Sequence, residues 1–457
     1  MKTKPLSTTA RTASLDILNT LDQGDDTLDH ILDELLSRHA FFSKKDRALL
    51  QAVVYGVLRW RARLDWIIVH FSKTRLNRID PRVMNILRIG LFQIIYLNRI
   101  PVSAAVNTSV EMAKIVKKPY VVRFVNALLR NAAGRYQQVS YPDAAQDPLS
   151  ALAIRKSLPD WIVKRWLNRF GLEDTERLCD AVNTIPPLTI RCNTLKTDRK
   201  KLLKCIEKDV AHAEYTSYSP VGVLLSNPKR TIGEMTAFEK GMFQVQDEAA
   251  QLVTFLLHPR PGEIILDACA GLGGKTGHIA QMMENRGKLM AMDVNEKKLF
   301  RLLPEMHRLG ISLVTTCVHD LSNPPDEKSV EKFDRVLLDA PCSGLGVLRR
   351  NPDAKWRTKE QDLIRQSKRQ VMFLDRLAHL VKPNGILVYC VCSLEPEENE
   401  SVVNGFLNTH PNFAIENNRD RMPDKARSLL TGNGCLKTFP HFHNMDGFFA
   451  VRMKRMK

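Results

Sequence analysis

The chain has 457 residues, which is too long for one ordinary domain, so we expect two or three domains, each with its own core. Its 44% hydrophobic and 26% charged residues are typical of a soluble globular protein, and no apolar run approaches the roughly 18–20 residues that span a bilayer. The net charge of +18 is uneven, because residues 1–140 contain 22 Lys and Arg against 11 Asp and Glu. This asymmetry favours a polyanionic partner, with an ordinary solubilising surface as the alternative.

The N-terminus and the cysteines indicate a cytoplasmic protein. No apolar segment follows the basic Met1–Leu6, so these residues do not resemble a secretion signal. Nine cysteines, an odd number, argue against a disulfide framework. Cys435, His441 and His443 lack a fourth ligand and fit no zinc spacing, so we expect no metal site. A functional cysteine is therefore expected to act as a nucleophile or an acid or base.

Residues 1–138 are predicted to form an all-helical domain. Two boundaries have clear start signals, which are Ser43 as an N-cap and Pro81 at the first helical position after Asp80. Short polar connections favour a compact bundle. Apolar residues recur at spacings of three and four, as in Leu28, Ile31, Leu32 and Leu35.

Basic residues are concentrated in the middle of this bundle. They are Arg59, Arg61 and Arg63 around Trp60, followed by Arg75, Arg78 and Arg82. Such a mixture suits contacts with phosphates of a nucleic acid, and an ordinary exposed helix face is the alternative.

A polar stretch over residues 136–147 predicts a linker, and residues 148–240 predict a small α+β connecting subdomain. Within it, Leu158–Trp161 opens an amphipathic helix that runs through Phe170, and residues 186–235 contain short strands.

Residues 241–457 are predicted to form an α/β domain with a mostly parallel sheet covered on both faces. From Gly262 onwards, short apolar strands alternate with helices, which is the pattern of such sheets. The strands are expected at 263–268, 288–293, 313–318, 333–340 and 385–392, with a helix at 361–381.

A glycine-rich loop lies at the first strand-to-helix junction, over residues 266–276. It is not a P-loop, because Cys269 stands where the first glycine should be, and not a dinucleotide fingerprint, because Thr276 occupies the third glycine position. Asp293 ends the next strand nineteen residues after Gly274, a placement that suits hydrogen bonds from ribose hydroxyls. S-adenosylmethionine has no phosphate, so its loop needs close backbone approach more than anion capture.

A plain tight turn is the alternative for this loop. Three acids favour a ligand site over a plain turn, because Asp293, Asp320 and Asp339 all lie near the carboxyl ends of predicted strands. Open α/β sheets bind ligands at that edge.

Two cysteines follow strands of the same predicted sheet, Cys342 after the fourth and Cys392 at the end of the fifth, so both could face one cleft. Most cysteines are small buried hydrophobes, and this alternative fits Cys269, Cys317 and Cys390 better than the other two.

Methylation of carbon 5 of cytosine would use two thiols and an acid. Carbon 5 is a poor nucleophile until a thiolate adds to carbon 6. An acid such as Asp339 could offset charge at ring nitrogen 3, and a second cysteine could assist release of the product.

Several motifs resemble the bacterial RsmB (Sun, Fmu) family of 16S rRNA cytosine-C5 methyltransferases. The two cysteine motifs are the most specific. They span residues 339–346 with 349–353, and 392–400, and shorter signatures lie at 191–196 and 243–247. The N-terminal bundle resembles the RNA-binding NusB fold at residues 46–50, 87–90, 101–107 and 124–130.

The resemblance implies a Rossmann-like methyltransferase domain that uses S-adenosylmethionine and acts on 16S rRNA, preceded by the NusB-like bundle and the connecting subdomain. By position, it implies Cys392 as the nucleophile, Cys342 as the releasing cysteine and Asp339 as the acid of the first cysteine motif. We expect Cys392 rather than Cys390 as nucleophile, because Cys390 lies deeper in the strand, and we expect a monomer. The implied cofactor-binding residues are Cys269, Ala270, Gly271, Leu272, Gly273, Gly274, Lys275, Asp293, Asp320 and Asp339.

Two positions depart from the usual family pattern. Gly271-Leu272 replaces Ala-Pro in the cofactor loop, and Val391 replaces the threonine before the nucleophile. We expect cofactor binding to survive the first change, because backbone shape dominates there, whereas the second removes a local hydrogen bond.

Two other functions stay open. One is cytosine-C5 methylation of tRNA or DNA, although a DNA enzyme would use the cysteine at position 342 as its nucleophile. The other is a non-catalytic RNA-binding or ribosome assembly factor, which would not need the cofactor loop, the acids and both cysteines.

Overall fold

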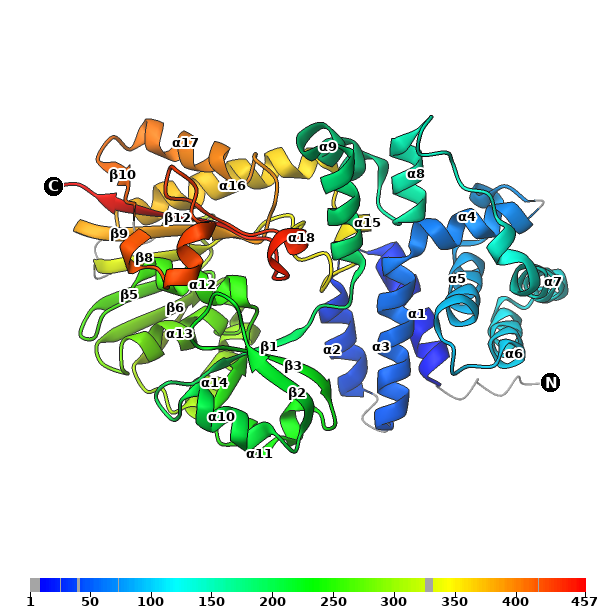
Figure 1. Cartoon of the computed structure of the whole chain (residues 1–457), viewed down its shortest axis with the longest axis horizontal. Coiled ribbons are helices and arrows are strands. Elements are labelled where there is room, and N and C mark those ends of the chain that lie inside the picture. The colour runs from blue at the N-terminus through cyan, green and yellow to red at the C-terminus, as the bar shows by residue number, and fades with distance from the viewer. Residues whose placement is uncertain (1–8, 25, 39–41, 73, 325–331, 418) are drawn as a thin grey trace. The chain divides into compact units, whose positions relative to one another are not determined.

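The computed structural model describes residues 9–24, 26–38, 42–72, 74–324, 332–417 and 419–457. Residue contacts divide the chain into two compact units. The helical unit comprises the chain up to Thr184 together with Leu348–Thr358, and the α/β unit comprises Ile185–Val347 and Lys359–Lys457 (Figure 1). Residues 1–8, on which the expectation about a secretion signal rests, lie outside the described residues.

The helical unit is built from α-helices around one apolar core. Buried residues occur on every side of α5, from Val83 to Gln93, so this helix lies at the centre of the core. The helices are α1 (Ala10–Gln23), α2 (Leu28–Arg38), α3 (Lys44–Arg59), α4 (Arg61–Phe71), α5 (Pro81–Tyr96), α6 (Val102–Ala113), α7 (Pro119–Arg135), α8 (Pro148–Arg155), α9 (Asp160–Asn183) and α15 (Ala354–Arg357), with short 3₁₀ turns η1 (Leu76–Arg78), η2 (Lys114–Val116) and η3 (Tyr136–Gln138).

The predicted helix starts are confirmed. The Ser43 side chain accepts a hydrogen bond from the Asp46 amide, and Asp80 caps α5 with Pro81 in the first turn. The helix predicted to end at Phe170 leaves helical geometry at Gly171, whose φ is +75°, and helical residues then continue to Asn183. Only glycine adopts that conformation without strain, so this residue separates two helical segments.

The arginines around Trp60 do not form the exposed phosphate-binding surface that the sequence suggested. Arg59 is buried and donates to the Arg349 carbonyl oxygen at 2.9 Å. Arg61 forms an ion pair with Asp22 at 2.9 Å. The Arg63 guanidinium packs over the Trp60 ring. Arg59, Arg61 and Arg63 therefore contact other residues of the helical unit, whereas Arg75, Arg78 and Arg82 are exposed.

Residues 348–358 belong to the helical unit although they lie within the predicted 241–457 range. The Trp356 indole donates to the Leu58 carbonyl at 2.7 Å, and the Asp353 carboxylate accepts from the Leu28 amide at 3.4 Å. The Lys355 ammonium donates to Asn183 Oδ1 at 2.6 Å. These bonds fix the chain segment that includes residues 349–353, the second part of the first cysteine motif.

The α/β unit begins with a four-stranded antiparallel sheet in the order β2-β3-β1-β4. Its own apolar core includes Ile190, Leu202 and Phe243. Its elements are β1 (Leu188–Cys192), α10 (Arg199–Ile206), β2 (Val210–Tyr215), β3 (Gly222–Pro228), η4 (Ile232–Glu234), α11 (Thr236–Glu239) and β4 (Phe243–Val245).

The larger sheet of this unit follows the order β10-β12-β9-β8-β5-β6-β7, with β11 paired to β12. Strands β9, β8, β5, β6 and β7 are parallel, which confirms the predicted parallel sheet. Strands β10 and β12 add an antiparallel edge that the sequence analysis did not predict. The strands are β5 (Ile264–Ala268), β6 (Lys288–Asp293), β7 (Val314–Val318), β8 (Phe333–Asp339), β9 (Val381–Val391), β10 (Phe413–Ile415), β11 (Leu436–Lys437) and β12 (Phe449–Arg455).

Helices cover both faces of this sheet, as Figure 1 shows. Neighbouring residues of β5 enter different cores, Ile265 with Leu252 and Ile279, and Leu266 with Phe373 and others, because successive strand residues point to opposite faces. The helices are α12 (Glu248–Leu257), α13 (Gly274–Met282) and α14 (Glu296–Leu309) on one side and α16 (Glu360–Ala378) and α17 (Glu400–Thr409) on the other, with η5 (Arg419–Arg421), η6 (Asp424–Leu429) and α18 (Pro440–His443) near the C-terminus.

Two searches of the described residues concern membranes and metals. None of the helices there is long and apolar enough to cross a bilayer. The same residues contain no group of three or more His, Cys, Asp or Glu side chains placed to hold a metal ion.

Candidate cofactor and active site

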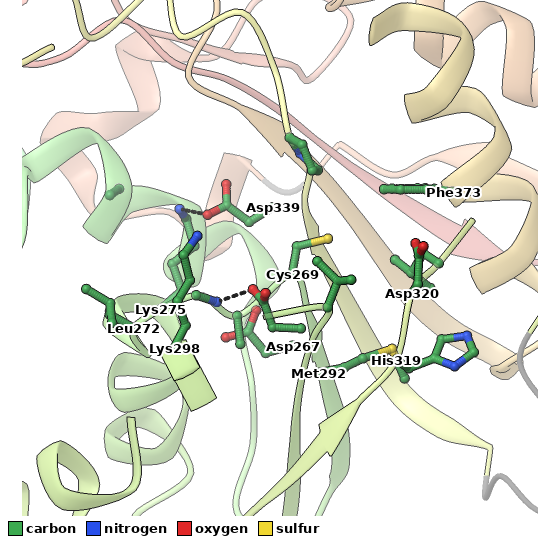
Figure 2. A pocket seen from close by; sticks show the side chains of 18 of the residues that line it. Asp267, Cys269, Leu272, Lys275, Met292, Lys298, His319, Asp320, Asp339 and Phe373 are labelled. Carbon is green, nitrogen blue, oxygen red and sulfur yellow. Dashed lines mark hydrogen bonds and ion pairs between the residues drawn. The ribbon is translucent and has the colours of Figure 1, made fainter. Parts of the chain in front are cut away.

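A cavity of about 480 Å³ opens at the carboxyl ends of β5, β6, β7 and β8 (Figure 2). This is the edge at which open α/β sheets bind ligands. Among the predicted cofactor residues, those that line it are Cys269, Ala270, Gly271, Leu272, Gly274, Lys275, Asp293, Asp320 and Asp339.

The glycine loop owes its shape to its backbone. Cys269, Gly271 and Gly273 all have positive φ, at 65°, 57° and 83°. Gly273 does not line the cavity, and a Cβ atom there would lie 2.7 Å from Leu302 Cγ. The glycine therefore permits close packing of the loop on α14, which fixes the start of α13 beneath the cavity.

Two buried side chains anchor this loop from below. Arg191 of β1 donates to the Gly274 carbonyl oxygen at 2.7 Å, and burial lowers the pKa of its guanidinium to about 9. Asp267 at the end of β5 accepts from the Thr276 hydroxyl at 2.6 Å. Burial raises the pKa of Asp267 to about 7, against the opposing effect of that hydrogen bond. The small sheet and β5 thus both hold the first turn of α13.

The strand-end acids have different partners. Asp293 accepts hydrogen bonds from the amides of Gly271 and Asn295, each at 2.8 Å, so it ties the glycine loop to the end of β6. Asp320 accepts from the Ser322 amide at 2.8 Å, and this hydrogen bond is the largest cause of the lowered pKa of Asp320. Both carboxylates line the cavity and can accept hydrogen bonds from ligand hydroxyls or amines.

Asp339 is paired with Lys275 across the cavity floor. The Lys275 ammonium lies 2.6 Å from Asp339 Oδ2, as the dashed line in Figure 2 shows. Burial lowers the pKa of Lys275, but the carboxylate of Asp339 and other groups more than offset this, so the pKa is raised overall. The other oxygen, Asp339 Oδ1, lies 3.3 Å from the sulfur of Cys390. The carboxylate is therefore held at both oxygens.

The sulfur atoms of Cys342 and Cys392 lie 3.3 Å apart. Both residues are half-buried, whereas Cys390 is buried and faces Asp339 instead. The hydrogen bond with Cys392 and burial both raise the pKa of the Cys342 thiol well above its ordinary value. Neither thiol lines the 480 Å³ cavity. Asp339 lines it, and so does Pro341, the residue directly before Cys342. The predicted meeting of the two cysteines at one sheet edge is thus present.

The buried carboxylate of Glu398 joins the two cysteine loops. It accepts hydrogen bonds from the amide and hydroxyl of Ser343, next to Cys342, and from the hydroxyl of Ser393, next to Cys392. Gln370 of α16 donates to the same carboxylate at 3.3 Å. Burial raises the pKa of Glu398, against the opposing effect of these hydrogen bonds. The sequence analysis included Glu398 in a motif but gave it no role, because its partners come from other elements.

Other cavity residues were also missed by the sequence analysis. Phe373 and Arg369 come from α16, and Lys298 comes from α14, so they do not lie at strand ends. In Figure 2, Phe373 and Asp320 lie across the cavity from Lys275. The helix at 361–381 was predicted, but its apolar pattern indicates packing only.

Known proteins match the chain over nearly its whole length. Residues 254–454 match the family described as 16S rRNA methyltransferase RsmB/F, residues 8–134 match the NusB family, and residues 158–231 match the ferredoxin-like domain of RsmF/B-like methyltransferases. The probable ribosomal RNA small subunit methyltransferase B of Bacillus subtilis is 35% identical over 450 residues, which are 98% of this chain and 99% of that protein. The chain belongs to the RsmB/F methyltransferase family.

Solved structures support the same family assignment. The crystal structure of PH0851 has a TM-score of 0.78 and 26% identity, and the match covers 99% of this chain and 100% of that one. A methyltransferase homolog protein from Pyrococcus horikoshii has a TM-score of 0.58 and 26% identity over 68% of this chain and 99% of that one. The predicted fold, a Rossmann-like methyltransferase domain with a NusB-like helical region, is confirmed.

The RsmB/F family uses S-adenosylmethionine, and the cavity fits this cofactor. Within the described residues, two buried polar atoms of the cavity have no hydrogen-bond partner, the acceptor Asp267 Oδ1 and the donor Gln246 Nε2. The amino acid end of S-adenosylmethionine has an ammonium that can donate to the free acceptor and a carboxylate that can accept from the free donor. Asp293 and Asp320 can accept from ribose hydroxyls or the adenine amine, and Phe373 and Leu321 offer apolar contact for a base.

The two departures from the family pattern have different surroundings. Leu272 is 49% exposed at the cavity, and the Ala270 amide of the same loop donates to the Met292 carbonyl at 2.8 Å, so backbone bonds rather than this side chain hold the loop. Val391 is the last residue of β9, and its buried side chain packs with apolar neighbours on one face of the sheet.

Proposed function

We propose that this protein methylates carbon 5 of a cytosine in 16S rRNA through a covalent bond between Cys392 and carbon 6. The observation that carries the proposal is the pair of thiols 3.3 Å apart, one of which follows by three residues an acid, Asp339, that lines the cofactor cavity. The relatives support the substrate, because they are named ribosomal RNA small subunit methyltransferase B. Their action on rRNA also favours the cytoplasm as the location, and the expectation of a monomer stays a prediction.

The first step is addition of the Cys392 thiolate to carbon 6, which makes carbon 5 nucleophilic. The raised pKa of Cys342, caused first by its hydrogen bond with Cys392 and then by burial, keeps the proton on Cys342. The Cys342 thiol can therefore donate a hydrogen bond to the Cys392 sulfur, 3.3 Å away. Asp339 is proposed to hold the Lys275 ammonium, 2.6 Å away, where this cation offsets the negative charge that develops at ring nitrogen 3.

S-adenosylmethionine supplies the methyl group as an electrophilic sulfonium. After the new carbon–carbon bond forms, carbon 5 holds both a methyl group and a proton. The proton leaves to solvent water, and the C–H electron pair re-forms the double bond while the bond to Cys392 breaks. The Cys342 thiol, which has kept its own proton, is proposed to assist this release by donating a hydrogen bond to the departing sulfur. This step restores the Cys392 thiolate and releases 5-methylcytosine.

RNA must present its target base outside the stack to reach such a site. Enzymes that act on bases flip the target into a pocket, at a cost of a few kcal/mol that is smallest for unpaired bases. We therefore propose a cytosine in a loop or single-stranded stretch of 16S rRNA. The basic helical unit, with exposed Arg75, Arg78 and Arg82, is proposed to contact the phosphates of the same RNA.

The test compares three cysteine variants on unmethylated 16S rRNA. We expect Cys392→Ala to abolish methyl transfer and to form no adduct, and Cys342→Ala to accumulate a covalent RNA–protein adduct on denaturing gels. Cys205, which is exposed on α10, provides the control, since Cys205→Ala should match the unmodified protein. Adduct formation only in Cys392→Ala would reverse the two roles and overturn the proposed mechanism.

Three further measurements test the proposed substrate and reaction against the alternative functions. A titration with S-adenosylmethionine that detects no binding would favour the non-catalytic assembly factor. Methylation of tRNA at a rate equal to that of 16S rRNA would favour the tRNA enzyme. Mapping 5-methylcytosine in 16S rRNA with and without this gene should reveal one cytosine that depends on the protein.

A further inference from the structure

The helical unit contains a second cavity, between the start of α5 and the start of α7. Its volume of about 460 Å³ lies within the range of about 300–1,000 Å³ that ligand clefts occupy. All of its lining comes from residues 74–83 and 116–124, so the site belongs to the helical unit alone. None of these residues takes part in the cofactor cavity.

The floor of this cavity is apolar and its rim has an uncovered aromatic ring. Val83 and Val121 are buried at the floor, and Phe124 is half-buried beside them. Tyr120 stands at the rim with 59% of its surface exposed. An exposed aromatic ring beside an apolar floor offers a flat face on which a planar group can stack.

The rim is also positively charged. Arg78 and Lys118 line the cavity and are exposed. Among the described residues, the lining contains one acid, Asp80, which is paired with Arg82. The Arg82 guanidinium donates to the Asp80 carboxylate at 3.0 Å, and this hydrogen bond is the largest cause of the lowered pKa of Asp80. Three further exposed cations, Arg75, Lys117 and Arg123, are chain neighbours of the lining residues Thr74, Lys118 and Phe124.

We propose that this cavity binds one unpaired nucleotide of an RNA strand, with the base stacked on Tyr120 and the flanking phosphates on Arg78 and Lys118. The side chains of Thr74 and Asn77 line the cavity and supply donors and acceptors for a base edge. The inference rests on the proposed function, because that function makes RNA the substrate. An acidic peptide would satisfy the cations but would not use the exposed ring as a stacking face.

The experiment measures binding of a fluorescent single-stranded RNA that contains no cytosine to the full-length protein. We expect Tyr120→Ala to weaken binding at least about fivefold, the lower limit for loss of one stacked base. Lys118→Gln and Arg78→Gln should each reduce the slope of log K against log salt by about 0.7. Because the probe contains no target base, the result does not depend on whether Cys392 is the nucleophile.

Two control variants and one spectroscopic variant sharpen the test. Tyr215 is also exposed, at 46%, but the Arg199 guanidinium covers its ring at 4.1 Å, so Tyr215→Ala should bind RNA normally. Lys114 is already paired with Glu111 at 2.6 Å, so Lys114→Gln should leave the salt slope unchanged. Tyr120→Trp should keep RNA binding, and RNA should quench its added fluorescence. The circular dichroism spectrum and the denaturant unfolding curve of each variant should match those of the unmodified protein, which shows that the helical unit folds.

Two results would overturn the proposal. One is a change in RNA affinity of less than twofold in a correctly folded Tyr120→Ala variant. The other is competition by polyglutamate that equals competition by unlabelled RNA at the same charge concentration, since this would make the site a general anion-binding surface.

Discussion

Glu398 in the α/β unit and Lys355 in the helical unit are both buried among neutral hydrogen-bond partners, and their side chains carry charges of opposite sign. Glu398 in the α/β unit accepts from Ser343, Ser393 and Gln370. Lys355 in the helical unit donates to Asn183 Oδ1 and to the carbonyl oxygens of Arg59 and Ser157. Burial is the largest cause of both pKa shifts, raising that of Glu398 and lowering that of Lys355 to about 7.

The two clusters differ in what their partners do. Two partners of Glu398, Ser343 and Ser393, directly follow the two thiols in the chain, so this carboxylate is placed to hold the loops that carry the proposed catalytic cysteines. The partners of Lys355 lie at the ends of α3 and α9 and between α8 and α9, so this ammonium joins helices. Similar burial therefore holds two cysteine loops together in one unit and joins helices in the other. Four predictions test this contrast.

The largest effect is expected for Glu398→Ala. Loss of the carboxylate frees the Ser343 and Ser393 loops, and a misplaced reactive group costs about 10²-fold in rate. We expect single-turnover methyl transfer to fall about 10²-fold with unchanged affinity for S-adenosylmethionine, and Glu398→Gln to retain an intermediate rate. The control is Glu296→Gln, an exposed residue in the first turn of α14. Equal rates for Glu398→Ala and the unmodified protein would remove the positioning role.

Arg59→Met should lower stability rather than RNA binding. The change removes the buried donor to the Arg349 carbonyl oxygen, and an unsatisfied buried acceptor costs about 1–3 kcal/mol. Denaturant unfolding should show a lower free energy of unfolding, while the folded variant binds RNA as before. Arg78→Met, at an exposed cation, should show the reverse pattern. A stable Arg59→Met protein with weakened RNA binding would restore the phosphate-binding role suggested by the sequence.

Lys355→Met should change how stability depends on pH. Burial lowers the folded-state pKa of Lys355 from 10.5 to about 7, so between these values the unfolded chain binds more protons than the folded one. The free energy of unfolding should therefore rise with pH above about 7, by at most about 1.4 kcal/mol per pH unit. Lys355→Met should lack this rise when unfolding is measured at pH 7 and pH 9. Lys204→Met, at an exposed lysine, should keep it, and identical pH dependence of the two variants would contradict the assignment.

The smallest effect is expected for Leu272→Ala at the cofactor cavity. Backbone hydrogen bonds from Ala270 and Gly271 hold the loop, and the Leu272 side chain is half exposed. The affinity for S-adenosylmethionine, measured by calorimetry, should change less than threefold, or about 0.6 kcal/mol. Gly273→Ala is the matched contrast, because its Cβ would collide with Leu302 and its φ is +83°, so its affinity should fall clearly further. A larger loss in Leu272→Ala than in Gly273→Ala would refute the backbone argument.

Local sequence patterns predicted most of the fold but fewer of the contacts. The parallel strands, the caps at Ser43 and Asp80 and the position of the glycine loop follow from short-range rules of periodicity, capping and backbone freedom. The antiparallel strands β10 and β12 were missed, since their pairing joins residues far apart in the chain. The domain boundaries and the catalytic roles of individual residues stay predictions.

The sequence by itself determined the family, the sheet and the two cysteine motifs, because each depends on residues that are close in the chain and on strands that end at the same edge. Only the tertiary structure decided the partners of the charged groups. It paired Lys275 with Asp339, placed Glu398 between two loops and buried Arg59 instead of exposing it. The physical reason is that the energy of a charged group in a low-dielectric interior depends on the groups packed around it. Those groups come from distant parts of the chain.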